Sequence, residues 1–168
     1  MANTKIYLLL GGNEGDRQGW LAKGREGIEG RIGSIGKASG IYETGAWGKE
    51  DQAPFLNQVA VVETALTARE VLQQITIIEQ DVANRIRTQK WAARTLDIDI
   101  LFFGDEVIHE EGLTIPHAHL QERRFALTPL CEVAPDMVHP LLGKSCRELL
   151  AECPDHLPVT LLQASHAL

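Results

Sequence analysis

The chain has 168 residues and a formal net charge of -7, with 44% hydrophobic and 23% charged residues. This length fits one domain that buries roughly 70% of its unfolded surface, so we expect a single domain over residues 1–168. The composition excludes a disordered chain. The acidic balance argues against nucleic acid as a partner, because phosphate backbones attract basic faces.

The apolar segments are too short for a membrane protein. No run approaches the ~18 apolar residues of a membrane helix, and the N-terminal segment lacks the features of a secretory signal. Cys131, Cys146 and Cys153 are odd in number and lack Cys-x-x-Cys spacing, which is typical of free thiols. We therefore expect a cytoplasmic protein that does not bind membranes.

The chain begins with a strand and a helix. Residues 4–10 are apolar and predict a buried strand, which Gly11-Gly12-Asn13 ends. Asp16 is placed to cap the helix that follows. A weaker strand is predicted over residues 35–42.

A second strand–helix unit follows a polar loop over residues 43–54. Residues 55–64 predict a strand, and Thr67-Ala-Arg-Glu70 is a capping box that opens a helix. The apolar stripe of this helix consists of Val71, Leu72, Ile75, Ile78 and Val82. The polar residues 84–95 then lead into a strand over residues 96–103.

The order strand, helix, strand, strand, helix, strand is the ferredoxin-like split pattern. It predicts an α+β fold, in which helices pack on a mainly antiparallel sheet. Beyond it we expect a short strand at 106–108 and a short helix that begins at Thr128-Pro129. Residues 136–168 are predicted to form a C-terminal helical extension, whose helix opens with the capping box Ser145-Cys-Arg-Glu148.

The sequence Asp97-Ile98-Asp99 places two acids within an apolar strand. Because side chains alternate along a strand, both carboxylates point to one face, with their Cα atoms ~7 Å apart. Two like charges at this spacing repel, so a compensating charge is needed. Mg2+ is a natural partner, since it takes one or two carboxylates together with phosphate oxygens. The alternative is a half-exposed strand whose acids pair with nearby arginines.

Four cations lie in the polar segment just before these acids: Arg85, Arg87, Lys90 and Arg94. Arginine offers a planar fork for phosphate oxygens, and lysine offers a point charge. A basic loop beside paired carboxylates has the parts needed for phosphoryl transfer, which depends on positioning and charge neutralisation. A solvated loop that pairs with surface acids is the alternative.

Several aromatic residues are placed to bind a flat ligand. Phe55 and Asn57 lie on the same face of their strand, one offering a ring and the other an amide edge. Trp47, Trp91 and Phe125 lie in or beside predicted loops. A heterocycle stacked between rings and hydrogen-bonded at its edge would use these residues, although each aromatic alone is more often part of a core.

Taken together, these motifs resemble one family. The run Arg85-Ile-Arg87, Trp91 and Arg94-Thr-Leu-Asp-Ile-Asp-Ile100 closely resembles the defining motif of the hydroxymethyldihydropterin pyrophosphokinases. Further matches, in order, are Gly12-Asn13, Tyr42-x-Thr44, Phe55-Leu-Asn57, Ile115-Pro-His117 and Arg123-x-Phe125-x-Leu127. The resemblance covers residues 5–135.

The resemblance implies a ferredoxin-like αβα sandwich with helices on both faces of the sheet, and a monomer. It implies ATP and 6-hydroxymethyl-7,8-dihydropterin as substrates, with transfer of the β,γ-diphosphate to the pterin hydroxymethyl oxygen and release of AMP. Two Mg2+ ions are expected as cofactor, held by Asp97 and Asp99.

The resemblance also implies roles for individual residues. The catalytic residues would be Arg85, Arg94, Asp97 and Asp99. The pterin would bind to Thr44, Gly45, Trp47, Phe55, Asn57, Trp91 and Phe125, with Phe55 and Phe125 on the two sides of its ring. The ATP site would consist of Glu79, Arg87, Ile100, His117 and Arg123.

Two other classes of protein are weighed against this interpretation. A nucleotidyltransferase also pairs carboxylates around magnesium, but it would release pyrophosphate instead of AMP. An RNA-binding module of ferredoxin-like fold would carry a Lys/Arg-Gly-Phe-Gly-Phe-like run on its central strands, which is absent from this sequence.

Overall fold

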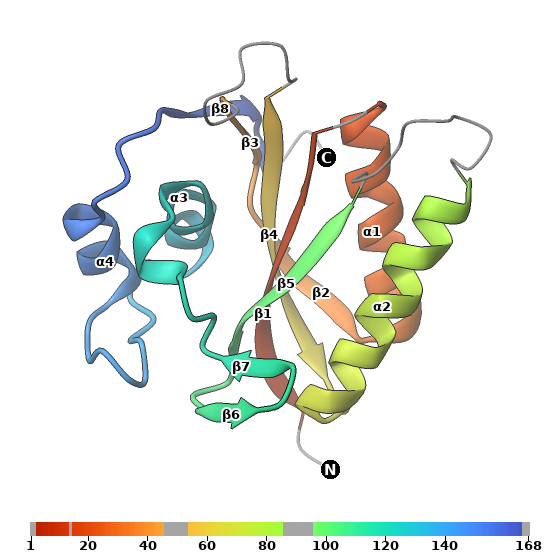
Figure 1. The fold of residues 1–168 in the computed structure, drawn as a ribbon, viewed down its shortest axis with the longest axis horizontal. Helices are drawn as coiled ribbons and strands as arrows, with labels where there is room; N and C mark the ends of the chain where they lie inside the picture. Colours follow the sequence, from red (N-terminus) through yellow and green to blue (C-terminus); the bar gives the residue numbers. More distant parts are fainter. Residues whose placement is uncertain (1–2, 14, 46–53, 86–95, 166–168) are drawn as a thin grey trace.

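The computed structural model describes residues 3–13, 15–45, 54–85 and 96–165 and forms one main sheet between two layers of helices (Figure 1). The strand order is β5-β1-β4-β3-β8, with β2 also paired to β4, and every pair is antiparallel. These strands are β1 (Thr4–Gly12), β2 (Ser34–Ala38), β3 (Ile41–Thr44), β4 (Phe55–Thr64), β5 (Asp97–Phe103) and β8 (Val159–Gln163).

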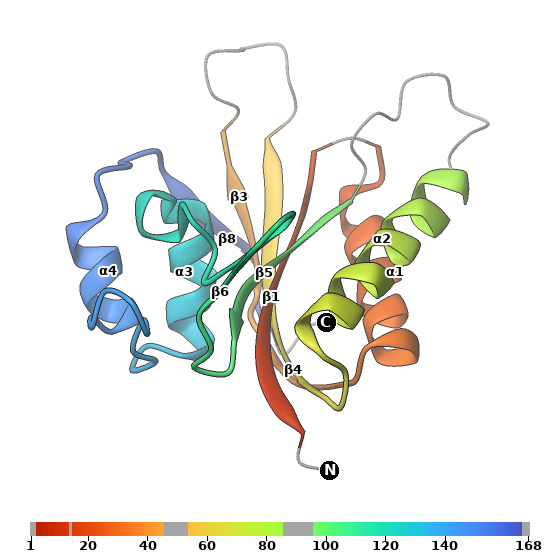
Figure 2. The same cartoon turned by 60° about the horizontal axis from the view of Figure 1, so that its bottom comes forward.

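Helices cover both faces of this sheet. On one face lie α1 (Arg17–Arg31) and α2 (Ala68–Arg85), and on the other lie α3 (Arg124–Val133) and α4 (Cys146–Glu152) (Figure 2). A separate hairpin, β6 (Ile108–Glu110) and β7 (Leu113–Ile115), precedes the short 3-10 helix η1 (Leu120–Glu122). The prediction of an α+β, ferredoxin-like fold with a mainly antiparallel sheet is confirmed.

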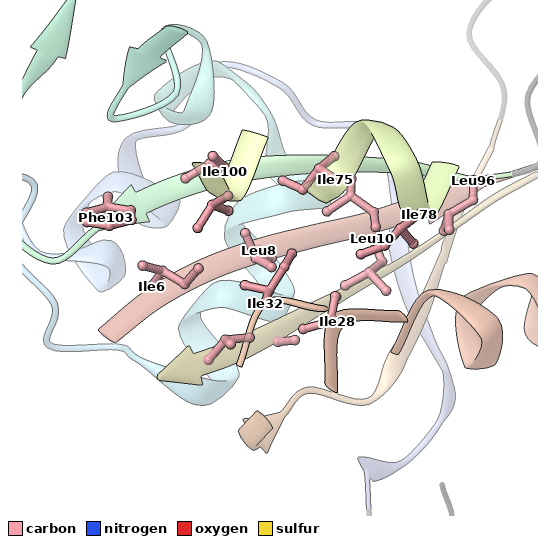
Figure 3. Packing of buried hydrophobic residues seen from close by; sticks show 14 of the residues in the cluster. Ile6, Leu8, Leu10, Ile28, Ile32, Ile75, Ile78, Leu96, Ile100 and Phe103 are labelled. Atoms are coloured by element: carbon pink, nitrogen blue, oxygen red, sulfur yellow. The ribbon is translucent and has the colours of Figure 1, made fainter. Parts of the chain in front are cut away.

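Alternation along the strands divides the core between the two faces. Ile6, Leu8 and Leu10 of β1 pack toward α1 and α2, together with Ile100 of β5 (Figure 3). Ile98 of β5 belongs to the same cluster. The intervening residues of β1, such as Leu9, pack toward α3 and α4. Because both faces of the sheet are covered, its central strands are apolar throughout, as the sequence indicates.

The predicted starts of the first two helices are confirmed in detail. The Asp16 carboxylate accepts a hydrogen bond from the Gly19 backbone N–H at 3.1 Å. At α2 the Glu70 carboxylate accepts from the Thr67 N–H at 2.9 Å, and the Thr67 hydroxyl accepts from the Glu70 N–H at 3.1 Å. These bonds satisfy N–H groups that have no partner within the helix.

The prediction of one strand over residues 35–42 is wrong, because the chain breaks into β2 and β3 at Ser39-Gly40. The buried Ser39 hydroxyl accepts the Val59 N–H at 2.9 Å and so takes the place of a backbone partner. Gly40 has no room for a side chain, since a Cβ there would lie 2.7 Å from the Gln163 carbonyl oxygen in β8. The break therefore arises from contacts with β4 and β8.

The C-terminal third differs most from prediction. The strand expected at 106–108 lies at 108–110 and pairs with β7, which was not predicted. The helix expected to begin at Thr128-Pro129 is wrong in its start: α3 begins at Arg124 and holds Pro129 inside it. Within the predicted helical extension over 136–168, the structure places α4 and also β8, which pairs with β3.

In α3 the proline leaves the carbonyl of Phe125, four residues earlier, without its helical N–H partner. The helix continues because its apolar face is buried, with Ala126, Leu127 and Leu130 almost fully covered. Among the helices of the described ranges, none has the length and apolar character needed to cross a membrane.

Candidate active site

A cavity of about 560 Å³ lies at the end of the sheet where β1 and β3 end and where β4 and β5 begin. Because these strands are antiparallel, strand ends that are distant in sequence meet at the same end of the sheet, at the top of Figure 1. The cavity opens on the face that carries α3. Its walls are formed by Leu9, Gly11, Gly12, Thr44, Gly45, Phe55, Asn57, Glu79, Asp97, Asp99, Arg123, Phe125 and Leu157.

The floor of the cavity is a row of residues that face each other across three strands. Gly11 of β1 pairs with Asp97 of β5 on one side and with Asn57 of β4 on the other. A Cβ atom on Gly11 would lie only 2.6 Å from Asn57 Oδ1. Glycine at this position therefore makes room for the Asn57 amide. The Cα atom of Asn57 is about 10 Å, two strand spacings, from that of Asp97.

Asp97 and Asp99 both face this cavity, and Ile98 between them is buried on the other face of the sheet, in the core beneath α1 and α2. The predicted alternation is thus confirmed. Across residues 3–13, 15–45, 54–85 and 96–165 the structure contains no group of three His, Cys, Asp or Glu side chains that could hold a metal ion. Two carboxylates fit Mg2+, because this ion keeps waters and takes substrate phosphate oxygens as its other ligands.

Glu79 brings a third acidic side chain to the cavity from α2. Its carboxylate accepts the outward N–H of Ile98 at 2.8 Å, at the open edge of β5. Burial raises the pKa of Glu79, and the charges of Asp97 and Asp99 raise it further, although the hydrogen bond from Ile98 acts in the opposite direction. Three acids at one edge make a region that attracts cations.

His117 and Arg123 approach from the segment before α3. Burial lowers the pKa of His117, and the positive charge of Arg123 lowers it further, while Asp99 acts in the opposite direction. The Nδ1 atom of His117 accepts the His119 backbone N–H at 3.2 Å, so its proton lies on Nε2. The Arg123 guanidinium lies 5.8 Å from the centre of the Phe125 ring, a cation–π distance.

The other end of the cavity combines aromatic rings with buried polar groups. Phe55 pairs with Thr44 across β4 and β3, and Phe125 of α3 also lines the cavity. Thr44 and Asn57 are only 4% and 5% exposed, and among the described residues the Thr44 hydroxyl oxygen has no hydrogen-bond partner. Buried polar groups of this kind favour a ligand with complementary hydrogen-bonding groups.

The sequence of residues 7–135 matches the model of the family described as 7,8-dihydro-6-hydroxymethylpterin-pyrophosphokinase (HPPK). The chain belongs to the HPPK family. The resemblance inferred from the motifs is therefore confirmed.

Relatives of this HPPK chain agree with that assignment. It is 41% identical over 147 residues to the 2-amino-4-hydroxy-6-hydroxymethyldihydropteridine pyrophosphokinase of Aquifex aeolicus, with 88% of this chain and 91% of that protein covered. The enzyme of the same name from Methylorubrum extorquens is 37% identical over 150 residues, covering 89% and 93% of the two chains.

Solved structures share the HPPK fold. The wild-type HPPK-DHPS of Plasmodium falciparum superposes with a TM-score of 0.74 at 18% identity and covers 89% of this chain. The chain spans 43% of that longer protein. At this identity, the likeness bears on the fold alone.

The structure brings together most of the site residues predicted for this HPPK chain. Those that line the cavity are Thr44, Gly45, Phe55, Asn57, Glu79, Asp97, Asp99, Arg123 and Phe125. His117 is close enough for Asp99 and Arg123 to shift its pKa. The side chain of Ile100 points away from the cavity, into the core beneath α2, so only its backbone is available to a nucleotide (Figure 3).

Five predicted residues are not tested. Trp47, Arg87, Trp91 and Arg94 lie outside the described residues. Arg85, expected in a loop, is the last residue of α2, and its side chain is not among those described.

Four lining residues were not predicted as site residues: Leu9, Gly11, Gly12 and Leu157. The two glycines were interpreted only as the end of the first strand, with Gly12 also part of the motif match. Strand alternation on β1 could have found Leu9, because it shares a face with Gly11. No local signal marks Leu157, which reaches the cavity only through the path of the C-terminal segment.

Proposed function

We propose that both substrates of this HPPK chain bind in the cavity and that the diphosphate is transferred there. As a member of this family the chain is a 2-amino-4-hydroxy-6-hydroxymethyldihydropteridine pyrophosphokinase. It transfers the diphosphate of ATP to 6-hydroxymethyl-7,8-dihydropterin in folate biosynthesis, with ATP as its co-substrate. The proposal concerns which residues do this and how.

The observation that carries the proposal is the row Asp97, Gly11, Asn57 across three adjacent strands. Asn57 offers an amide that can donate to and accept from the edge of a pterin ring. The Cα atom of Asp97 lies about 10 Å from that of Asn57, and Asp99 lies two residues farther along β5. The phosphates would be held there. Because Gly11 has no side chain, the Asn57 amide oxygen can lie over it, and a pterin bound to that amide would direct its hydroxymethyl group toward the phosphates.

The pterin end of the cavity has the chemistry for a flat polar ring. Phe55 and Phe125 would lie on either side of the ring, and offset stacking of this kind contributes about 1 kcal/mol beyond burial. Asn57 would pair with the ring edge, and the Thr44 hydroxyl is available as a further partner. Gly45 and Trp47, with Trp91, belong to the predicted pterin contacts that complete this end.

Two Mg2+ ions, held by Asp97 and Asp99, would neutralise the triphosphate and polarise it for transfer. Arg123 lines the same cavity and offers a guanidinium to phosphate oxygens. His117, with its proton on Nε2, can donate one hydrogen bond near Asp99. Glu79, Arg87 and the Ile100 backbone are the remaining proposed nucleotide contacts.

The reaction is an in-line displacement. The pterin hydroxymethyl oxygen forms a bond to the β-phosphorus of ATP, and the bond from that phosphorus to the oxygen bridging to the α-phosphate breaks. The hydroxyl proton leaves to water, and AMP departs with the bridging oxygen. Arg85 and Arg94 are proposed to stabilise the charge that moves onto the α-phosphate.

Product identity tests this proposal. The protein is mixed with ATP, Mg2+ and the pterin alcohol, and the nucleotide is identified by chromatography. AMP together with a pterin diphosphate is expected. Pyrophosphate with a nucleotidylated pterin would instead indicate a nucleotidyltransferase, and no consumption of pterin would overturn the proposal. Action as one domain, the monomeric state and the cytoplasmic location stay predictions.

A further inference from the structure

The C-terminal segment contributes a wall of the cavity, although it lies beyond the matched residues 7–135. Leu157 lines the cavity together with Thr44, Gly45 and Phe125. The register explains its position: Val159 of β8 pairs with Thr44 at the end of β3. Leu157 therefore lies just past the last strand pair, beside the point where the chain leaves β3.

A clasp defined by Arg124 and Asp155 holds this segment against α3. Arg124 Nε donates to the Asp155 carbonyl oxygen at 2.7 Å, and its guanidinium also donates to the Leu150 carbonyl at 3.4 Å. The Asp155 carboxylate accepts the Arg124 backbone N–H at 3.4 Å with one oxygen and the Leu157 N–H at 3.0 Å with the other. One side chain thus joins the start of α3 to the backbone of Leu157.

The clasp lies next to residues that line the cavity. Arg124 stands between Arg123 and Phe125, which both line the cavity. The side chain of Arg123, the residue before α3, makes no capping hydrogen bond of its own, so Asp155 supplies an acceptor for the first N–H of that helix. A carboxylate is favoured there by the helix dipole.

From these contacts we propose that Leu157, held in place by the Arg124–Asp155 clasp, is a specificity-determining residue that contacts the pterin. The inference rests on the proposed function and adds a residue to it. Leu157 is half-buried and apolar, and it lies at the ring-binding end of the cavity beside Thr44 and Gly45. It limits the space available to substituents on the pterin ring. Asp155 is a positioning residue that acts through it.

The test compares Leu157→Ala, Leu157→Val and Asp155→Ala with the wild-type chain. Leu162→Ala is the matched control, because Leu162 belongs to the same segment but is 44% exposed and does not line the cavity. The Kd of the pterin is measured by calorimetry in the presence of a non-hydrolysable ATP analogue. The KM of each substrate and kcat are measured separately, and thermal melting checks folding.

We expect Leu157→Ala to raise the pterin Kd about tenfold, in the range of methylene discrimination by apolar pockets, with a smaller rise for Leu157→Val. The KM for ATP stays at the wild-type value in these variants, and Leu162→Ala has the wild-type pterin Kd, KM values and kcat. A pterin alcohol with an added ring methyl group is accepted better by Leu157→Ala than by the wild type. Asp155→Ala also raises the pterin Kd. The double variant Leu157→Ala/Asp155→Ala has a pterin Kd little higher than that of Leu157→Ala alone, because both changes act on one wall of the cavity.

A wild-type pterin Kd in folded Leu157→Ala would overturn the inference, and so would an equal loss of affinity for ATP and pterin. An additive double variant would overturn the role of Asp155. Turnover by the wild-type chain keeps these outcomes separate from failure of the proposed function, in which the wild type itself would not consume the pterin.

Discussion

Replacing Gly11 by alanine should weaken pterin binding without harming the fold. The new Cβ would lie 2.6 Å from Asn57 Oδ1, so the amide must move by about 0.8 Å to regain an ordinary contact. A hydrogen bond of about 2.9 Å that lengthens by this amount is lost. With a buried partner left unpaired, the loss is about 2 kcal/mol, or about thirtyfold in the Kd of the pterin.

The assay is calorimetric titration of the pterin in the presence of a non-hydrolysable ATP analogue, with thermal melting in parallel. Gly36→Ala is the control, because Gly36 also lies in a strand, but among the described residues no atom beyond its chain neighbours lies within 4 Å of the added Cβ. The affinity for the ATP analogue should stay unchanged in both variants. An unaltered pterin Kd in Gly11→Ala would refute the role given to the floor of the cavity.

Three further predictions concern charged groups. Asp97→Asn or Asp99→Asn should lower kcat at least about 100-fold while circular dichroism stays unchanged, because several kcal/mol of charge stabilisation is lost. Asp105→Asn serves as control, since Asp105 is exposed. Near-normal turnover in either site variant would contradict the metal-binding role. Glu79→Gln, without Mg2+ or nucleotide, should raise the free energy of unfolding at pH 8, since a raised folded pKa means that the ionised carboxylate destabilises the fold. This gain in urea unfolding should shrink as the pH falls toward about 4, and a gain independent of pH would contradict the reasoning. Burial lowers the pKa of His139, and its Nδ1 accepts two backbone N–H groups. As the pH falls below about 6.5, the free energy of unfolding of the wild type should therefore decrease relative to that of His139→Gln. The decrease should be at most about 1.4 kcal/mol per pH unit. Parallel stability curves for the two proteins would show that this histidine does not titrate as expected.

Local patterns in the sequence determined the framework of the fold. Apolar strand patterns and the capping groups Asp16 and Thr67 placed β1, β4, β5 and the helices α1 and α2, because these signals act within a few residues. Strand alternation put Asp97 and Asp99 on one face. Together with the motif resemblance, this located the candidate site.

Only the tertiary structure decided what those residues face. Gly11 lies between Asp97 and Asn57 through pairing of β1 with β4 and β5, at sequence separations that no local pattern specifies. The break at Ser39 and Gly40 depends on contacts from β4 and β8. The position of Leu157 depends on the clasp with α3, since long-range hydrogen bonds, and not its own propensity, hold that segment at the cavity.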